Sequence, residues 1–195
     1  MVKLIGVSGS LRQGSFNASL LRAAAELMPP AAELAIGTLR GVPLYDADVE
    51  ASEGIPAAVV ALKESLAGAD GLLLATPEYN NSIPGVTKNA IDWMSRPASD
   101  IARVFRGKPV ALMGASPGGF GTILGQNAWL PVFRTLGAQL WSEGRLLVSR
   151  ASTVFANDGT LSDPKVRQAL QGFLADYVAF VQSNRRAAHL PSADR

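Results

Sequence analysis

Residues able to bind a charged ligand gather in three segments, each placed directly after a short apolar run. The first segment holds Ser10, Arg12, Ser15, Phe16 and Asn17. Hydroxyl, amide and guanidinium groups are donors suited to phosphate oxygens. A loop that leads into a helix adds free backbone N–H groups and the positive end of the helix dipole. The segment therefore predicts an anion site.

Two familiar nucleotide loops do not fit this first segment. It lacks the Gly-Lys-Ser/Thr ending of a P-loop and the Gly-x-Gly-x-x-Gly pattern of a dinucleotide-binding turn. One alternative stays open: Ser15 only caps the following helix, Asn17 begins its first turn and Arg12 is solvated.

The second segment is Pro77, Glu78, Tyr79 and Asn80, with a further proline at position 84. Two prolines stiffen the loop, which suits a platform beside a flat ring system. We expect backbone amides around residues 78–80 to bind the polar edge of such a ring, with the Tyr79 ring as an aromatic wall. Alternatively, each proline only marks the limit of a loop.

The third segment is Ser116, Pro117, Gly118 and Gly119, within a stretch rich in glycine. Glycine lets the backbone approach a ligand closely. A glycine-rich loop by itself is weak evidence, and it gains weight only if it lies beside the other two segments.

The composition excludes several kinds of chemistry. The chain has no cysteine and one histidine, His189, which sits in a polar tail. We therefore expect no thiolate nucleophile, no metal site and no catalytic residue of the Ser/His type. Any redox chemistry must be carried by a bound organic cofactor.

Charge and hydropathy limit the partners. Lys and Arg total 18 against 16 Asp and Glu, and the basic residues are scattered, so no nucleic-acid partner is expected. No apolar run approaches the roughly 20 residues needed to span a bilayer. The apolar start at residues 1–5 is too short for a signal peptide. We expect a cytoplasmic protein without a membrane partner.

The segments lie within a regular alternation of elements. Apolar runs predict strands at 2–7, 33–36, 71–76, 109–114 and within 140–148. Helical spacing predicts helices at 17–28, 55–67, 86–94, 122–136 with a kink at Pro131, and 165–182. This order predicts an α/β fold: a flavodoxin-like three-layer sandwich with a five-stranded parallel sheet in the order 2-1-3-4-5.

The predicted topology brings the three segments together. They follow strands one, three and four, and ligands of such sheets bind beyond the carboxyl ends of the strands, where the strand order reverses. We expect one domain over residues 1–183, with 184–195 as a flexible tail.

Three motifs also resemble the NADPH-dependent FMN reductase family, most closely its bacterial quinone reductases, chromate reductases and azoreductases. The resemblance covers about residues 3–182. The stretch Leu44 to Asp48, after the second predicted strand, also matches the sequence pattern of the family. The motifs are Gly9-Ser10-Leu11-Arg12-x-x-Ser15-x-Asn17, Pro77-Glu78-Tyr79-Asn80 and Lys88-Asn89-Ala90-Ile91-Asp92-Trp93.

The resemblance implies FMN as cofactor and NADPH or NADH as electron donor. It implies that Ser10, Arg12, Ser15 and Asn17 hold the FMN phosphate, with Phe16 beside them. It further implies that residues 77–80 border the isoalloxazine ring, with residues 116–119 on its other side. The implied acceptors are quinones, azo compounds or similar small molecules, and the implied assembly is a homodimer or homotetramer. Within the stretch 124–136, Trp129, Leu130 and Pro131 occupy the region where some chromate-reducing relatives carry a tyrosine and an arginine, so chromate reduction and tetramer contacts stay open.

Two other functions compete with this one. A flavodoxin-type electron carrier is typically strongly acidic, which the net charge of +2 argues against. A flavin-free module that binds a phosphate-bearing ligand remains an alternative.

Two further patterns are ambiguous. Trp93 fits a core or a dimer seam. Arg103, Arg106 and Lys108 fit a solvated turn or a site for the phosphates of the nicotinamide cofactor.

Overall fold

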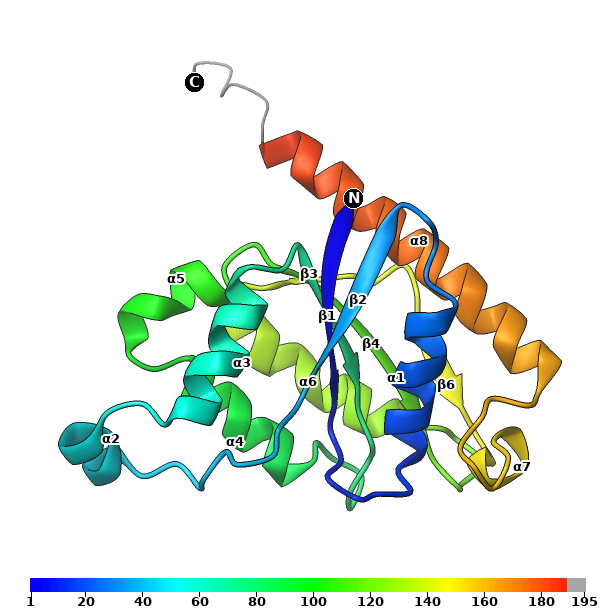
Figure 1. The fold of residues 1–195 in the computed structure, drawn as a ribbon, viewed down its shortest axis with the longest axis horizontal. Coiled ribbons are helices and arrows are strands. Elements are labelled where there is room, and N and C mark those ends of the chain that lie inside the picture. The colour runs from blue at the N-terminus through cyan, green and yellow to red at the C-terminus, as the bar shows by residue number, and fades with distance from the viewer. Residues whose placement is uncertain (189–195) are drawn as a thin grey trace.

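The computed structural model describes residues 1–188 and contains one parallel sheet. Its strands run in the order β2-β1-β3-β4-β5, and β6 also pairs with β4 (Figure 1). The predicted strand order is therefore confirmed, with a sixth strand added. The strands are β1 (Val2–Ser8), β2 (Ala32–Gly37), β3 (Gly71–Ala75), β4 (Pro109–Ala115), β5 (Gln139–Leu140) and β6 (Leu146–Val148).

The predicted fifth strand is divided into β5 and β6, which pair with the beginning and the end of β4. Between them, Gly144 lies against the Trp141 ring, where a Cβ atom would come within 2.1 Å of a ring carbon. The Trp141 ring packs against Phe173 and Tyr177. Burial of this tryptophan accompanies the break in the strand.

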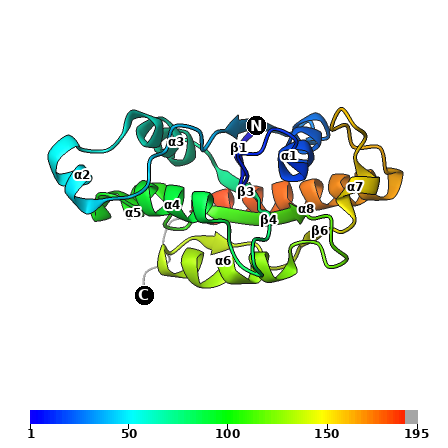
Figure 2. The same cartoon turned by 90° about the horizontal axis from the view of Figure 1, so that it is seen from below.

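Helices cover both faces of the sheet, as predicted. Figure 2 looks at the edge where the strands end, with α1 to one side and α3 and α4 to the other. The long helices are α1 (Phe16–Glu26), α3 (Ala57–Ala67), α4 (Gly85–Met94), α6 (Ile123–Thr135) and α8 (Pro164–Ala188). The sequence did not predict the short helices α2 (Ala47–Glu53), η1 (Ala98–Asp100), α5 (Ile101–Val104) and α7 (Ala151–Val154).

Helix α8 extends farther than the sequence predicted. It ends at Ala188, whereas the periodicity placed its end at Gln182. The helix thus runs into the segment expected to be a tail, and residues 189–195 of that segment lie outside the described residues. Within the described part of the chain, no helix has the length and apolar character needed to cross a membrane.

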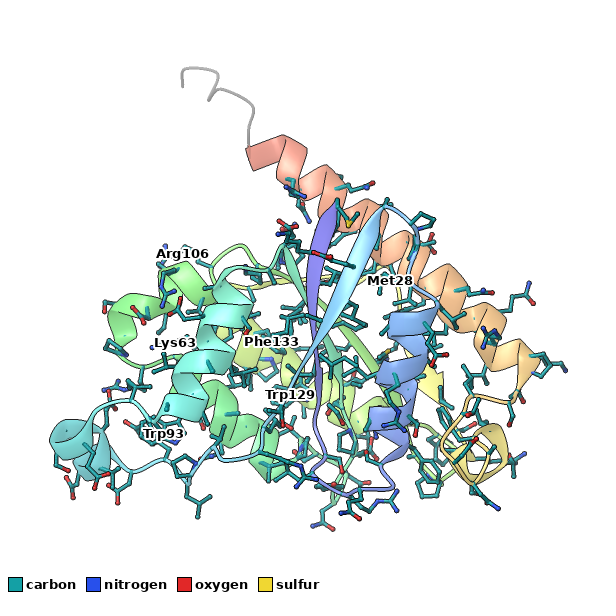
Figure 3. All side chains as sticks on the ribbon, viewed as in Figure 1. Met28, Lys63, Trp93, Arg106, Trp129 and Phe133 are labelled. Carbon is teal, nitrogen blue, oxygen red and sulfur yellow. The ribbon has the colours of Figure 1, made fainter. Side chains whose placement is uncertain are left out.

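Two hydrophobic cores hold the layers together. On one face, α1 and α8 pack on the sheet through residues such as Leu20 and Leu174. On the other face, α3, α4 and α6 bury Trp129 and Phe133, which Figure 3 labels. Strand β3 is buried along its whole length, as its consecutive leucines predict for a strand covered on both faces.

A buried tyrosine of α8 ties this helix to the centre of the sheet. The Tyr177 hydroxyl lies 2.9 Å from the carbonyl oxygens of both Leu72 and Pro109. Gly71 leaves room for it, because a Cβ atom there would lie 2.6 Å from the hydroxyl oxygen. Complete burial raises the pKa of Tyr177 far above its ordinary value, so the hydroxyl stays neutral and able to donate.

We expect Tyr177→Phe to lower the free energy of unfolding by about 1–3 kcal/mol, because buried carbonyl groups lose a donor without gaining water. Urea denaturation checks this. Tyr45→Phe is the matched control, because it removes a hydroxyl from an exposed tyrosine. Equal losses in the two variants would contradict the role assigned to the buried hydroxyl.

Candidate functional site

Three loops meet at the carboxyl edge of the sheet, at the lower end of Figure 1. They are residues 9–15 after β1 (the first loop), residues 76–84 after β3 (the second loop) and residues 116–122 after β4 (the third loop). Ser8 pairs with Ala75, and Ala75 pairs with Met113, so the strands end side by side. The three predicted segments are therefore brought together.

The first loop turns around Arg12. The Arg12 carbonyl accepts a hydrogen bond from Ser15 N at 3.2 Å, and the Arg12 amide donates to Ser10 Oγ at 3.3 Å. The Arg12 side chain is exposed, and its guanidinium carbon lies 5.4 Å from the centre of the Phe16 ring. The loop thus presents a guanidinium group at the rim of the site.

Ser15 caps helix α1, since its Oγ accepts from Ala18 N at 3.3 Å. The amide groups of Phe16 and Asn17 have no acceptor among the described residues. These amides and the Ser15 hydroxyl proton remain available at the positive end of the helix. Capping and anion binding are therefore compatible here.

The Asn17 side chain, for which the resemblance implies a phosphate contact, binds backbone groups at the end of β4. Asn17 Nδ2 donates to the carbonyl of Ala115, and Asn17 Oδ1 accepts from the amide of the same residue, both at 2.9 Å. The side chain is buried and joins α1 to the end of β4. It thereby fixes the first and third loops relative to each other.

The second loop is a tight hairpin. Tyr79 and Ser82 exchange two backbone hydrogen bonds, of 3.1 and 3.0 Å. Between them, Asn80 and Asn81 have φ values of +50° and +60°, which asparagine tolerates better than most residues. The Tyr79 amide, expected to face a ligand, is therefore occupied. The Tyr79 hydroxyl lies 3.3 Å from Ser10 Oγ and links the first and second loops.

The Glu78 carboxylate binds the beginning of helix α6 rather than pointing at solvent. Its Oε2 accepts from the amides of Leu124 and Gly125, at 2.8 and 2.9 Å. A carboxylate at a helix N-terminus satisfies free amides and offsets the helix dipole. Glu78 thus fixes the second loop to the helix that follows the third loop.

The third loop is open at its tip and fixed at its base. Pro117, Gly118 and Gly119 are exposed, and Phe120 is 83% exposed. Ser116 Oγ donates to the carbonyl of Gly121 at 2.6 Å, so this hydroxyl closes the loop. The predicted residues 116–119 therefore border the site, with Ser116 occupied by its own loop.

Close approach of the loops depends on two glycines. A Cβ atom at Gly9 would lie 2.7 Å from Pro77 and 2.8 Å from Thr87 Oγ1. A Cβ atom at Gly114 would lie 1.9 Å from Thr122 Oγ1 and 2.4 Å from a backbone carbonyl oxygen. Any side chain at these positions would push the loops apart.

Two of the sequence motifs contact each other beside the second loop. Asn89 Nδ2 and Trp93 Nε1 donate to the Pro43 carbonyl at 2.7 and 2.9 Å, and Asn89 Oδ1 accepts from Tyr45 N. Trp93 is fully buried, so within this chain it belongs to the core. The stretch 43–45 is therefore held against α4.

Ionic contacts extend this attachment to α2. Arg96 Nε lies 2.8 Å from a Glu50 carboxylate oxygen, and the hydrogen bond holds the pKa of Glu50 below its ordinary value. Glu50 also accepts from the Tyr45 hydroxyl, which raises the pKa of that phenol. Helix α2 has no buried residue, so these polar contacts hold it in place.

The cluster of Arg103, Arg106 and Lys108 does not join the site. These residues precede β4 and lie at the amino edge of the sheet, where Figure 3 labels Arg106. Arg103 binds Glu64 with both guanidinium nitrogens, each at 2.8 Å. The cluster therefore lies at the opposite edge of the sheet from the three loops, and a role toward the nicotinamide phosphates stays untested.

The donor set suits a phosphate-bearing ligand such as FMN. The first loop offers hydroxyls, free amides and one guanidinium, and residues 9–17 contain no carboxylate. The hydroxyl groups of Ser8 and Thr87 are also buried here without a partner among the described residues. The sequence analysis did not select these two residues, because an unpaired hydroxyl becomes visible only after folding. No cluster of metal-ligating side chains lies within the described residues.

Comparison with known proteins places this chain in a family. The family model for NADPH-dependent FMN reductase matches residues 2–153. An NAD(P)H-dependent FMN reductase of Pseudomonas aeruginosa is 42% identical over 87% of this chain and 90% of its own length. A 2-hydroxy-1,4-benzoquinone reductase of a Burkholderia species is 37% identical over 94% and 98%. A solved NAD(P)H:acceptor oxidoreductase of Paracoccus denitrificans has a TM-score of 0.84 and 32% identity over 94% and 99%. The chain therefore belongs to the NADPH-dependent FMN reductase family, whose enzymes use FMN with NAD(P)H as electron donor.

Proposed function

We propose that this chain is an NAD(P)H:quinone oxidoreductase that binds FMN across the three loops. The observation that carries the proposal is the convergence of the first loop's donors, with no carboxylate among residues 9–17, on the edge where the strand order reverses. Similarity to a benzoquinone reductase supports a quinone as acceptor. The overall reaction converts NAD(P)H, a proton and a quinone into NAD(P)⁺ and a quinol.

The first loop supplies the phosphate contacts in this proposal. Arg12 offers a charged fork, and Ser10, Ser15 and the amides of residues 16 and 17 offer neutral donors. Asn17 contributes through its backbone amide, because its side chain holds Ala115. The helix dipole of α1 adds a favourable field for the anion.

The second and third loops border the ring. Pro77 is buried against Gly9, which fixes the base of the second loop, and Tyr79 is half-exposed at its tip. The amides of Glu78 and Asn80 have no acceptor among the described residues. In the proposal, these two amides bind the polar edge of the ring. When bound, FMN supplies the redox chemistry by accepting two electrons from NAD(P)H and passing them to the acceptor. The protein needs no acid or nucleophile of its own for this reaction.

Titration with FMN followed by anaerobic addition of NADPH tests the function. We expect a protein-bound flavin band in the visible spectrum, bleached by NADPH and restored by a benzoquinone. A bound flavin that NADPH fails to bleach would instead indicate an electron carrier. No binding of FMN at all would overturn the proposal.

We expect Arg12→Ala to weaken FMN binding by about tenfold or more, as the loss of a charge-assisted hydrogen bond worth about 1.5–3 kcal/mol implies. Turnover at saturating FMN should fall much less, because Arg12 does not border the ring. Fluorescence titration and steady-state rates measure both effects. Arg22→Ala is the control, since Arg22 is an exposed arginine farther along α1. Unchanged FMN affinity in Arg12→Ala would remove this residue from the phosphate site.

We expect Glu78→Ala to lower both stability and FMN affinity, because the amides of Leu124 and Gly125 lose their acceptor and the second loop loses its anchor. The stability loss should be about 0.5–2 kcal/mol, typical of a lost helix cap. Asp163→Ala is the matched control: Asp163 caps α8 through the amides of Lys165 and Val166. Thermal unfolding should show similar losses in both variants, whereas FMN affinity should fall in Glu78→Ala alone. A similar fall in FMN affinity in both would reduce Glu78 to a general stabiliser.

We also propose a homodimer that works in the cytoplasm, where NAD(P)H is available. Exposed apolar side chains near the second loop support an interface, because such patches mark contact surfaces. Leu44 is 85% exposed, and Tyr79 and Val86 are exposed at 47% and 38%. Analytical ultracentrifugation distinguishes a dimer from a tetramer or a monomer.

A further inference from the structure

A column of three side chains stands behind the first loop. The Arg12 guanidinium lies over the Phe16 ring, with its carbon 5.4 Å from the ring centre. The Phe16 ring in turn stacks on the Phe155 ring, with centres 5.9 Å apart and planes 23° apart. The column therefore runs from the exposed Arg12 to the buried Phe155.

Phe155 lies far from the first two loops in the sequence, in a segment whose start contacts the third loop: Arg150 N and Ala151 N donate to the carbonyls of Gly118 and Ser116. It follows α7 and lies just beyond residues 2–153, the stretch that the family model matches. Its amide donates to the Ala151 carbonyl, and its backbone forms an antiparallel bridge with Leu161. Phe155 is 6% exposed and packs in the same core as α1. Backbone hydrogen bonds and core packing thus hold the base of the column in place.

The remainder of the segment after α7 is also attached to α1. Gly159 lies so close to α1 that a Cβ atom there would be 2.8 Å from Arg22 Nη2 and 2.8 Å from Ser19 Oγ. The segment therefore supports α1 along its first turns, and Phe155 is the residue of this segment that stacks on Phe16.

We propose that Phe155 is a positioning residue that selects phosphorylated flavin by holding Phe16, and through it Arg12, in place. This inference rests on the proposed FMN site. An exposed arginine loses rotamer freedom when it binds a ligand, and that loss weakens binding. A ring fixed beneath the guanidinium reduces the loss before the phosphate arrives, because it already restricts the side chain. Phe155 fixes that ring without touching the ligand.

Comparison of FMN with riboflavin, which lacks the phosphate, isolates this effect. Phe155→Leu keeps an apolar side chain of similar volume, so the core should tolerate it. We expect the Kd for FMN to rise about three- to tenfold, as the loss of an aromatic pair implies, with the Kd for riboflavin unchanged. In an Arg12→Ala background the same substitution should have little further effect on FMN binding.

The matched control is Phe173→Leu. Phe173 is buried in the same core cluster, but it contacts Trp141 and lies on α8. The Phe173→Leu variant should lose a similar amount of stability and keep the wild-type ratio of the Kd for FMN to the Kd for riboflavin. If Phe155→Leu does not give the wild-type circular dichroism spectrum, Phe155→Met provides the same comparison.

The outcomes separate this inference from the proposed function. A wild-type protein that prefers FMN, together with a Phe155→Leu variant that keeps the same preference, overturns the role of Phe155 alone. Equal weakening of FMN and riboflavin by Phe155→Leu also overturns it, because that pattern reports general loss of structure. A wild-type protein that binds neither flavin overturns the site itself.

Discussion

Parallel pairing of β1, β3 and β4 is the constraint on which the rest of the structure depends. In a parallel sheet every strand ends at the same edge, so the loops that follow these neighbours must meet. The register places Ser8, Ala75 and Met113 side by side. The strands also approach closely at their ends, and Gly114 leaves room there for Thr122 and a backbone carbonyl. A shift of register by one residue would exchange the faces of a strand and separate the loop ends.

Side chains that cross between loops turn this edge into one unit. Asn17 joins α1 to the end of β4, Glu78 joins the second loop to α6, and Tyr79 contacts Ser10. Each contact links residues far apart in the sequence. The site therefore depends on the whole edge of the sheet being formed. Arg12 in the first loop and Asn17 in the first turn of α1 differ in this respect: the Asn17 side chain is buried and fixes the backbone, whereas the Arg12 side chain is exposed at the rim of the site.

The sequence predicted the strands, the long helices and the three site segments. The spacing of apolar residues and the presence of turn-forming residues can both be read within a short stretch of sequence. The partners of individual side chains were not local. Nothing near Glu78 indicates that its carboxylate reaches Leu124, and nothing near Asn17 indicates Ala115 as its partner. Short elements such as α7 contain too few residues for a period to show. Trp141, which lies between β5 and β6, packs against rings of α8, and this distant contact was equally hidden from the local pattern.

The position of Tyr177 bears on the order in which the protein folds during its synthesis. Its hydroxyl binds carbonyls of residues 72 and 109, yet it lies on the helix that follows every strand. During synthesis the central strands emerge from the ribosome well before this helix, so the face of the sheet that α1 and α8 share is at first covered by α1 alone. When α8 arrives, Tyr177 adds a side-chain donor to the two carbonyls, and the helix completes the core on that face. Before that, the nascent chain has its strands but leaves part of this core open to solvent, the stage at which premature termination or slow translation exposes it most to aggregation.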